Sequence, residues 1–230
     1  MKSEITVWIF ELDRTAADLT EFNSWLSTDE AQRRVRLLRK QDRDRFTAAH
    51  GITRHVLSKT TGERPETLAF IRNPHGKPSL KGHRHLEFNL SHSDGVGALA
   101  VANGFPVGVD LERIVPIEPA VAELALSSSE YAELSHCGEH EAPTHFYRCW
   151  TRKEAMIKAL GLGLAQPPEI CDVTPDFGRE PRLLRPASES DMSVIWELFH
   201  FIPAAGYVGA LAAYGRGHSM VLNRWTPSAI

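Results

Sequence analysis

Two hydrophobic patterns alternate along the chain, and each predicts a different element. Apolar residues at every second position predict β-strands, whereas apolar residues three or four positions apart predict amphipathic helices. Up to residue 114 the patterns predict two helices and five strands: helices at 31–45 and 43–59, and strands at 5–10, 68–72, 86–91, 95–102 and 106–114. Ser27 and Glu30 have the spacing of a capping box, which predicts that the first helix begins there.

The rest of the chain repeats this order, with helices before strands. Its patterns predict helices at 118–137 and 144–160, then strands at 170–175, 181–185, 193–202, 207–215 and 219–225. The stretches GVGALAVANG (95–104) and YVGALAAYGR (207–216) are alike, which indicates an internal duplication. We therefore predict an α+β fold of two similar halves, residues 1–106 and 107–230. The Asn-Gly turn at Asn103–Pro106 predicts a hairpin between its flanking strands.

Composition narrows the class of protein. The chain has 230 residues, of which 42% are hydrophobic and 24% charged, and its net charge is −3. This is typical of a globular protein and favours neither nucleic acid nor an anionic membrane as a partner. Cys137, Cys149 and Cys171 have no disulfide or zinc spacing, so we expect a reducing, cytoplasmic environment. No apolar run approaches the roughly 18 residues of a transmembrane helix, and the N-terminus lacks a signal-peptide core.

Three carboxylates form a candidate metal site. Asp110 and Glu112 occupy alternate positions of one predicted strand, so both side chains project from the same face. On the long helix, Glu154 shares a stripe with two aromatic residues, so it points toward the protein. Three hard oxygen ligands completed by water suit Mg²⁺. Two other interpretations stay open: a surface pair between Glu154 and Lys158, and an edge strand with two solvated acids.

Polar and basic residues suited to phosphate gather in three places. Ser91 and His92 stand at a strand end in NLSHSDG, and Lys77 stands at a tight turn in HGKP. Seven Arg and Lys residues lie from Arg33 to Arg45. Each place has an ordinary alternative: a surface histidine, a turn with an exposed lysine, and a solvated helix face.

Several catalytic classes lack their motifs. A Ser-His-Asp triad built on His92 fails because neighbouring strand residues point apart and no G-x-S-x-G elbow exists. No P-loop is present. GLGLAQ is not a dinucleotide-binding fingerprint, since it follows a helix and lacks the third glycine.

The order of four motifs carries a family resemblance. GKP, FNLSHS, VGVDLE and WTRKEAMIKALG follow one another within residues 76–161, about a third of the chain. This series resembles the 4′-phosphopantetheinyl transferases of the larger, two-halved type that activates peptide and polyketide synthetases. The resemblance implies an enzyme that moves the phosphopantetheine arm of coenzyme A onto a serine of an apo carrier protein and releases adenosine 3′,5′-bisphosphate. It also implies a monomeric pseudo-dimer of two α+β halves with the active site in the cleft between them.

The resemblance also implies a role for each matching residue. Asp110, Glu112 and Glu154 would hold Mg²⁺, or Mn²⁺ in its place, and Glu154 would take the proton of the carrier serine. Lys158 would neutralise charge on the phosphates, and His92 would face them as a further catalytic group. Six residues would bind coenzyme A: Arg33, Arg45, Lys77, Ser91, His92 and Lys158.

The resemblance leaves two questions open. Glu30 stands where some family members have a phosphate-binding lysine, and Phe46 where some have a small hydroxyl residue, so the pocket for the 3′-phosphate and adenine is not defined. The acidic carrier protein has two candidate docking surfaces. One is the basic face of residues 33–45. The other is the amphipathic segment 115–134, whose apolar residues would equally well pack the core.

Two competing functions are kept as hypotheses. A strand with D-x-E also occurs in metal-dependent 3′–5′ exonucleases, but Asp172, Asp176 and Asp191 fall in predicted loops or strands rather than on the later helices such enzymes need. A non-enzymatic nucleic-acid-binding module would use the basic helix, although the net charge of −3 and the lack of a binding motif argue against it. We therefore expect coenzyme A and a carrier protein as partners, and neither nucleic acid nor a membrane.

Overall fold

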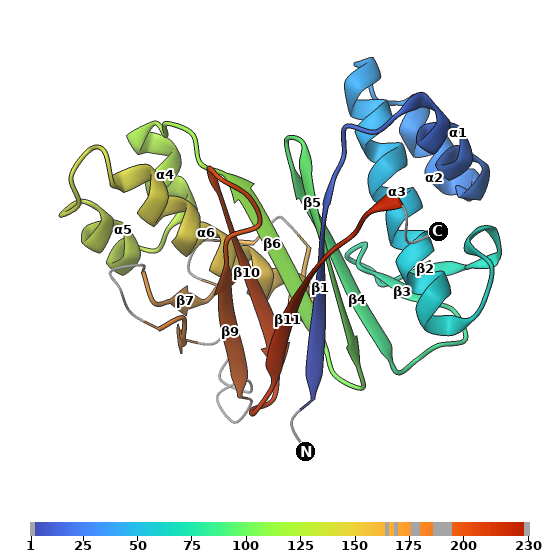
Figure 1. The fold of residues 1–230 in the computed structure, drawn as a ribbon. Helices are drawn as coiled ribbons and strands as arrows, with labels where there is room; N and C mark the ends of the chain where they lie inside the picture. Colours follow the sequence, from blue (N-terminus) through green and yellow to red (C-terminus); the bar gives the residue numbers. More distant parts are fainter. Residues whose placement is uncertain (1–2, 164–165, 168–169, 176–179, 186–194, 228–230) are drawn as a thin grey trace.

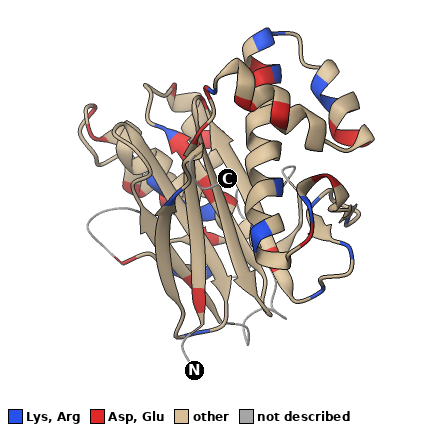
Figure 2. Ribbon diagram, turned by 45° about the vertical axis from the view of Figure 1, so that its right-hand side comes forward, with Lys and Arg blue, Asp and Glu red and all other residues tan. Residues whose placement is uncertain are grey.

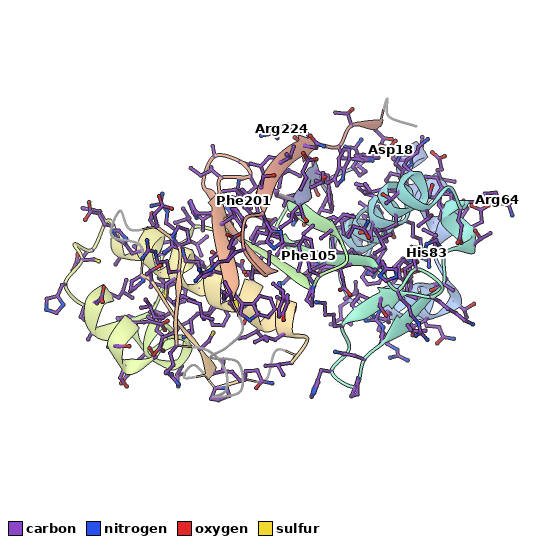
Figure 3. The ribbon with its side chains drawn as sticks, turned by 90° about the horizontal axis from the view of Figure 1, so that it is seen from below. Asp18, Arg64, His83, Phe105, Phe201 and Arg224 are labelled. Atoms are coloured by element: carbon purple, nitrogen blue, oxygen red, sulfur yellow. The ribbon has the colours of Figure 1, made fainter. Side chains whose placement is uncertain are left out.

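Two β-sheets share a buried core, and helices cover the outer face of each sheet (Figure 1). The computed structural model describes residues 3–163, 166–167, 170–175, 180–185 and 195–227. Side chains from both sheets, such as Val7, Val109 and Leu211, form the central cluster. Figure 3 shows Phe201, another member of this cluster, near the middle of the molecule. The described fold therefore has four layers, with two sheets between two groups of helices.

The first half builds one sheet and the helices that cover it. Its elements are β1 (Glu4–Glu11), α1 (Ala16–Trp25), α2 (Thr28–Val35), α3 (Lys40–Thr61), the 3-10 helix η1 (Pro65–Thr67), β2 (Phe70–Arg72), β3 (Pro78–Leu80), β4 (Leu86–Ser93) and β5 (Val96–Asn103). β1, β5 and β4 are neighbours in the sheet, whereas β2 and β3 pair with each other. Phe22, Ile52 and Phe88 belong to the core between this sheet and its helices.

The second half repeats this order of elements. Its elements are β6 (Val107–Arg113), α4 (Pro119–Ala125), α5 (Ser128–Leu134), α6 (Ala142–Leu160), β7 (Asp172–Val173), β8 (Leu183–Arg185), β9 (Trp196–Phe201) and β10 (Tyr207–Tyr214). The strand order β6-β10-β9 matches β1-β5-β4, with the first strand of each half beside its last. A further strand, β11 (Ser219–Arg224), returns to the first sheet and runs parallel to β1. The expected α+β pseudo-dimer is confirmed, while the boundary at residues 106 and 107 stays a prediction.

The period-two pattern of β6 decides which side chains meet α6. Val107, Val109 and Leu111 enter the central core between the sheets. Asp110 and Glu112 therefore project from the opposite face, which α6 covers. The sequence pattern predicted this shared face, and the structure adds the helix that lies over it.

Charged side chains concentrate on the helices and at the ends of strands, whereas most of the strand ribbon carries none (Figure 2). The outer sides of the helices face water, and the strands supply apolar side chains to all three cores. Among the described residues, no helix has both the length and the apolar character needed to cross a membrane.

The basic segment predicted as one helix at 31–45 is two helices. α2 ends at Val35 and α3 begins at Lys40. The loop between them is held by Arg43, whose Nη1 donates to the carbonyls of Leu37 and Leu38 at 2.9 and 2.8 Å. The apolar and basic pattern continues through the loop, so helical periodicity alone could not reveal the break.

The predicted helix at 118–137 is also divided, because Ser127 begins a new helix. The Ser127 side chain accepts the Glu130 amide, and the Glu130 carboxylate accepts the Ser127 amide, which is a capping box. α1 was not predicted, although Thr15 and Asp18 form a capping box of the same kind. Both helices are short, so their caps are more informative than their hydrophobic pattern.

The predicted hairpin at Asn103–Pro106 is wrong. β5 pairs with β1 and β4, and β6 pairs with β10, so this turn carries the chain from one sheet to the other. The likeness of the stretches in β5 and β10 is also out of register. Gly97 backs onto Phe10 on the helix-covered face, whereas Gly209 backs onto Phe201 in the central core. A shift of one residue exchanges the two faces of a strand, so the duplication lies in the topology rather than in this likeness.

Candidate active site

The site lies along the line where the two sheets meet. β4 and β6 are edge strands of their own sheets and lie close together without sharing a backbone ladder in the described structure. Three polar side chains of β4 bridge to β6 instead. Asn89 Oδ1 accepts the Val109 amide at 2.9 Å, Ser91 Oγ donates to Asp110 Oδ1 at 2.7 Å, and Ser93 Oγ donates to Glu112 Oε2 at 2.5 Å. These bonds fix both carboxylates of β6 against the first half.

A glycine brings α6 close to these carboxylates. A Cβ atom on Gly108 would collide with the Ala155 carbonyl oxygen and the Ala159 amide nitrogen. Only a residue without a side chain permits so close an approach of strand and helix. The contact turns the face of α6 that bears Glu154 and Lys158 toward Asp110.

Lys158 forms an ion pair across this contact. Its Nζ lies 2.5 Å from Asp110 Oδ1 and 2.9 Å from Ser91 Oγ. The alternative of an isolated surface pair between Glu154 and Lys158 is therefore not what the structure shows. The ammonium group instead links both halves through Ser91 and Asp110.

The other two carboxylates lie close to the charge of Asp110, with Glu154 buried and Glu112 half-buried. Burial and the negative charge of Asp110 raise the pKa of Glu154 to about 7, although Lys158 opposes the shift. Burial also raises the pKa of Glu112, a hydrogen bond from Ser93 opposes it, and the charge of Asp110 adds to it. Like charges held together in this way are stabilised by a cation.

Asp110 provides the observation that tests a metal at this place. The residue is 2% exposed, and its Oδ2 atom is buried with no hydrogen-bond partner in the described structure. A buried carboxylate oxygen without a partner is costly. Among the described residues, no group of three or more His, Cys, Asp or Glu side chains already stands at metal-binding distance. The donor set nevertheless fits a hard divalent cation, because three carboxylates converge and one oxygen lacks a partner.

A pocket of about 640 Å³ opens beside Lys158 and draws on both halves. Its basic lining residues are Arg33, His50, Arg72, His75, Lys77, His92 and Lys158. Arg33 has a buried Nη1 with no hydrogen-bond partner among the described residues, and its guanidinium lies over the Phe46 ring at 5.4 Å. Burial and the charge of Arg72 lower the pKa of Arg33. The pocket is therefore suited to an anion.

His92 lies on the wall of this pocket, on the strand face opposite Ser91 and Ser93. The residue is exposed, although neighbouring protein atoms displace part of the water around its ring. This crowding, followed by the charges of His50 and Lys158, lowers the pKa of His92. The neutral imidazole can then donate one hydrogen bond to a phosphate and still accept another.

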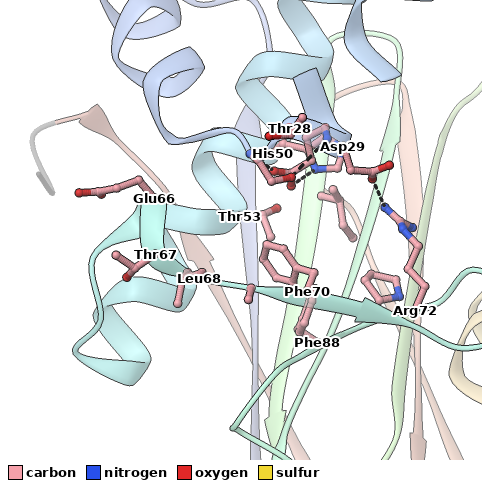
Figure 4. A pocket seen from close by; sticks show the side chains of 15 residues that line it. Thr28, Asp29, His50, Thr53, Glu66, Thr67, Leu68, Phe70, Arg72 and Phe88 are labelled. Carbon is pink, nitrogen blue, oxygen red and sulfur yellow. Dashed lines mark hydrogen bonds and ion pairs between the residues drawn. The ribbon is translucent and has the colours of Figure 1, made fainter. Parts of the chain in front are cut away.

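A second hollow of about 700 Å³ adjoins the first and shares His50, Arg72, Pro78 and Leu90 with it (Figure 4). Phe70 and Phe88 line it, and Asp29 faces Arg72 across it at 4.0 Å. Its lining comes from the first half alone and combines aromatic rings with acidic and hydroxyl side chains.

Family comparisons agree with this geometry. A family model described as the 4′-phosphopantetheinyl transferase superfamily matches residues 106–212, and one described as the N-terminal part of 4′-phosphopantetheinyl transferase matches residues 13–103. The 4′-phosphopantetheinyl transferase HetI of Nostoc sp. is 34% identical over 94% of this chain and 90% of its own length. The chain belongs to the 4′-phosphopantetheinyl transferase superfamily.

Two further relatives match a shorter part of this transferase. Sfp of Bacillus subtilis is 30% identical over 64% of this chain, and gsp of Aneurinibacillus migulanus is 32% identical over 68%. The matches span 65% and 64% of those relatives, just under two thirds of their length. These similarities confirm the resemblance and give no support to the exonuclease or the nucleic-acid-binding module.

The structure gathers most of the predicted site residues of the transferase, with two in unexpected surroundings. Arg45 donates to Asp13 at 2.8 Å and to Asp94 at 2.6 Å, so carboxylates engage two edges of its guanidinium. Lys77 points its ammonium group at backbone carbonyls. That Arg45 binds coenzyme A stays a prediction. The contacts of Lys77 favour a different role for its ammonium group.

Glu30 stands where some family members have a phosphate-binding lysine, and in this chain it stabilises the fold instead. It caps α2 with Ser27, and its Oε2 accepts from Arg54 at 2.6 Å. Burial alone would raise the pKa of Glu30, but hydrogen bonds from His50, Arg54 and Ser27 outweigh it and lower the pKa to about 2. Phe46 lies against His50, with ring centroids 4.1 Å apart, and beneath Arg33. Both departures therefore shape the wall near Arg33.

Several residues of the site were not predicted. Asn89 and Ser93 bridge the strands, Gly108 admits α6, and His50 lines both hollows. The alternation of Asn89, Ser91 and Ser93 along one strand was visible in the sequence and indicates a polar face. Its meaning depends on β6 lying alongside, which the sequence pattern does not specify.

Proposed function

We propose that this transferase moves the phosphopantetheine group of coenzyme A to a carrier-protein serine with the help of a divalent cation, Mg²⁺ or Mn²⁺. Asp110, Glu112 and Glu154 would hold the cation. The observation that carries the proposal is the buried, unpartnered Oδ2 of Asp110, whose other carboxylate oxygen pairs with Lys158 of the basic pocket. When bound, the cation would draw electron density from the pyrophosphate and offset its negative charge.

Glu154 acts as the base in this proposal. A carboxylate within reach of the serine hydroxyl can take its proton as the new bond forms. The carrier serine loses its hydroxyl proton to Glu154, and its oxygen forms a bond to the β-phosphorus of coenzyme A. The bond from that phosphorus to the bridging oxygen breaks, and adenosine 3′,5′-bisphosphate leaves with the electron pair. No covalent bond to the enzyme is needed, which agrees with the absence of a triad motif.

The cations of the pocket hold the substrate and the leaving group. Phosphoryl transfer depends mainly on positioning and charge neutralisation. Lys158 stands between Asp110 and the pocket, where it would contact the pyrophosphate. His92 would donate to a phosphate oxygen, and Ser91 would hold Lys158 in place. Arg33, which lines the pocket, would bind the 3′-phosphate.

The carrier protein would dock on α4 and reach Glu154 from that side. Val121 and Leu124 are 51% and 77% exposed, whereas Leu126 is buried, so the apolar segment is divided between surface and core. Val121, Leu124 and Glu154 line one hollow of about 250 Å³. An apolar helix face of the carrier seated there would bring its serine to the base. The basic loop around Leu38, which is 94% exposed, would meet the acidic part of the carrier.

The remaining properties follow from the same proposal. The transferase would act as a monomer, since residues from both halves of one chain line its anion pocket. All three cysteines are free thiols, which fits a cytoplasmic enzyme.

Intact-protein mass spectrometry tests the proposal directly. An apo carrier protein is incubated with the transferase, coenzyme A and Mg²⁺, and a gain of one phosphopantetheine group is expected. EDTA should abolish the gain, and added Mg²⁺ or Mn²⁺ should restore it. Transfer that continues in EDTA would reject the cation, whereas coenzyme A binding without transfer to any carrier would reject the activity.

A further inference from the structure

The side chain of Lys77 crosses from the first half to the second. Its Nζ donates to the carbonyl oxygens of Val107 and Ala159, each at 3.0 Å. Val107 begins β6, and Ala159 lies in the last turn of α6. One ammonium group therefore joins the GKP loop to the strand that bears Asp110 and to the helix that bears Glu154.

Asn73 ties the other end of the same loop to α6. Its Nδ2 donates to the Gly161 carbonyl at 2.9 Å, and its Oδ1 accepts the amides of His75 and Lys77 at 3.0 and 2.9 Å. Gly161 ends α6 in the left-handed region, with φ of 69°. A side chain there would lie 2.8 Å from Asn73 Nδ2, so the loop and the helix end are in close contact.

This arrangement satisfies carbonyl groups that a helix end leaves without partners. The last four carbonyls of a helix have no donor within the helix, and a cation is favourable beside them. The backbone amides of Gly161 and Leu162 satisfy two of these carbonyls. From the other half, Lys77 donates to Ala159, and Asn73 donates to the C-cap residue Gly161. Burial lowers the pKa of Lys77, and the charge of Glu87 opposes the shift. The ammonium is thus already committed to two acceptors inside the protein.

Arg33 provides the contrast within the same pocket. Both residues line it, but Arg33 has a buried Nη1 without a partner in the described structure, whereas Lys77 Nζ has two. A group that binds substrate charge needs a free donor, and a group that positions an element needs fixed acceptors. The two cations are therefore suited to different tasks.

We propose that Lys77 is a positioning residue, which with Asn73 clamps the end of α6 to β6, rather than a ligand of a coenzyme A phosphate. The inference rests on the proposed function, because its effect on turnover runs through Glu154 and Lys158 on α6. Loss of the clamp would let the helix end move, and these two side chains would lose their alignment with Asp110. Coenzyme A would still find Arg33 and His92.

Lys77→Met tests the clamp, since methionine keeps the apolar stem and removes the donors. We expect kcat to fall at least about tenfold, while KM and the calorimetric Kd for coenzyme A change by less than about twofold. The salt dependence of Kd should stay that of the wild type, because no phosphate contact is lost. Arg33→Met should do the opposite, raising Kd and flattening its salt dependence. Lys81→Met, on an exposed lysine nearby, is the matched control.

Two further measurements keep the inference testable if Lys77→Met is poorly folded. Asn73→Ala removes one hydrogen bond and should produce the same split between kcat and Kd to a smaller extent. Hydrogen exchange of the amides at 157–161 should accelerate in both variants, with or without a carrier protein. This readout stays valid if the proposed activity fails. A rise in Kd of tenfold or more with unchanged kcat and unchanged exchange would overturn the clamp and return Lys77 to the phosphate.

Discussion

The two halves of the molecule carry the same buried device. In the first half, Ser27 and Glu30 cap α2, and Glu30 Oε2 pairs with Arg54 of the long helix α3 at 2.6 Å. In the second, Ser127 and Glu130 cap α5, and Glu130 pairs with a lysine of the long helix α6, also at 2.6 Å. A capping glutamate thus anchors the long helix of each half. This shared part is the scaffold.

The strands that face the long helices differ. β1 presents Trp8 and Phe10 to the helices of the first half, both within an apolar core. β6 occupies the equivalent place in the second sheet and presents Gly108, Asp110 and Glu112 to α6. The two halves therefore share one scaffold, and only the β6 face carries the groups proposed for the reaction. The first half supplies most of the cations of the pocket, and the second supplies the carboxylates and Lys158.

The largest effect is expected from removing Asp110, one of the two carboxylates that distinguish β6 from β1. Asp110→Ala should lower kcat at least about a thousandfold, about 4 kcal/mol of barrier, because a cation ligand and the partner of Lys158 are lost. Steady-state kinetics would measure the loss, and circular dichroism should show an unchanged fold. The control is Glu4→Ala, an exposed carboxylate on β1, which should leave kcat unchanged. Full activity of Asp110→Ala would contradict the metal assignment.

The pairing of a capping glutamate with the long helix, which both halves share, should stabilise the folded protein in a pH-dependent way. The pKa of Glu30 is about 2 in the folded protein and 4.5 in the reference state, so its pairing stabilises the fold above pH 4.5 and is lost as the pH falls toward 2. Glu30→Gln should lower the free energy of unfolding by about 3 kcal/mol at pH 7. Urea titrations from pH 7 to pH 2.5 should show this difference shrinking. A difference that is constant over this range would mean that the charge of Glu30 contributes nothing.

The close packing of β6 against α6 should be sensitive to one methyl group. Gly108→Ala forces strand and helix apart and should cost about 1–3 kcal/mol of stability, with a loss of activity as Glu154 and Lys158 are displaced. Thermal unfolding and kinetics measure the two effects. Gly138→Ala is the control, because nothing lies within 4 Å of its Cβ position. Unimpaired activity in Gly108→Ala would show that the approach of α6 is not needed for alignment.

The smallest effect concerns which half receives the carrier. Leu124→Glu on α4 should raise KM for the carrier about tenfold, because it puts a charge on the apolar contact. Leu38→Glu on the basic loop should raise it less, mainly through slower association. KM for coenzyme A should not change in either variant. The reverse order of effects would move the docking surface to the first half.

Much of the site could be predicted, because strand alternation is a local property. It placed Asp110 and Glu112 on one face, and the helical stripe turned Glu154 inward. The capping box at Ser27 was visible for the same reason. The equivalent box at Ser127 was overlooked because apolar residues continue on both sides of it, so the segment resembled one helix. In the short helices the cap, not the periodicity, marks the boundary.

The parts that could not be predicted depend on contacts between distant strands. Nothing local says that β5 and β6 belong to different sheets, or that Ser91 and Ser93 would reach Asp110 and Glu112. The one-residue offset between the similar stretches of β5 and β10 shows the same limit. The likeness aligns Gly97 with Gly209, yet these two glycines face opposite sides of their sheets.

The return of β11 to the first sheet has a consequence for how the protein is made. Glu4 pairs with Ser219, so β1 is synthesised long before the strand that covers its edge. The second sheet is complete at β10, before β11 has emerged. Until then β1 presents an open edge to other chains. The first sheet therefore begins to form early and is completed late, when β11 pairs with β1.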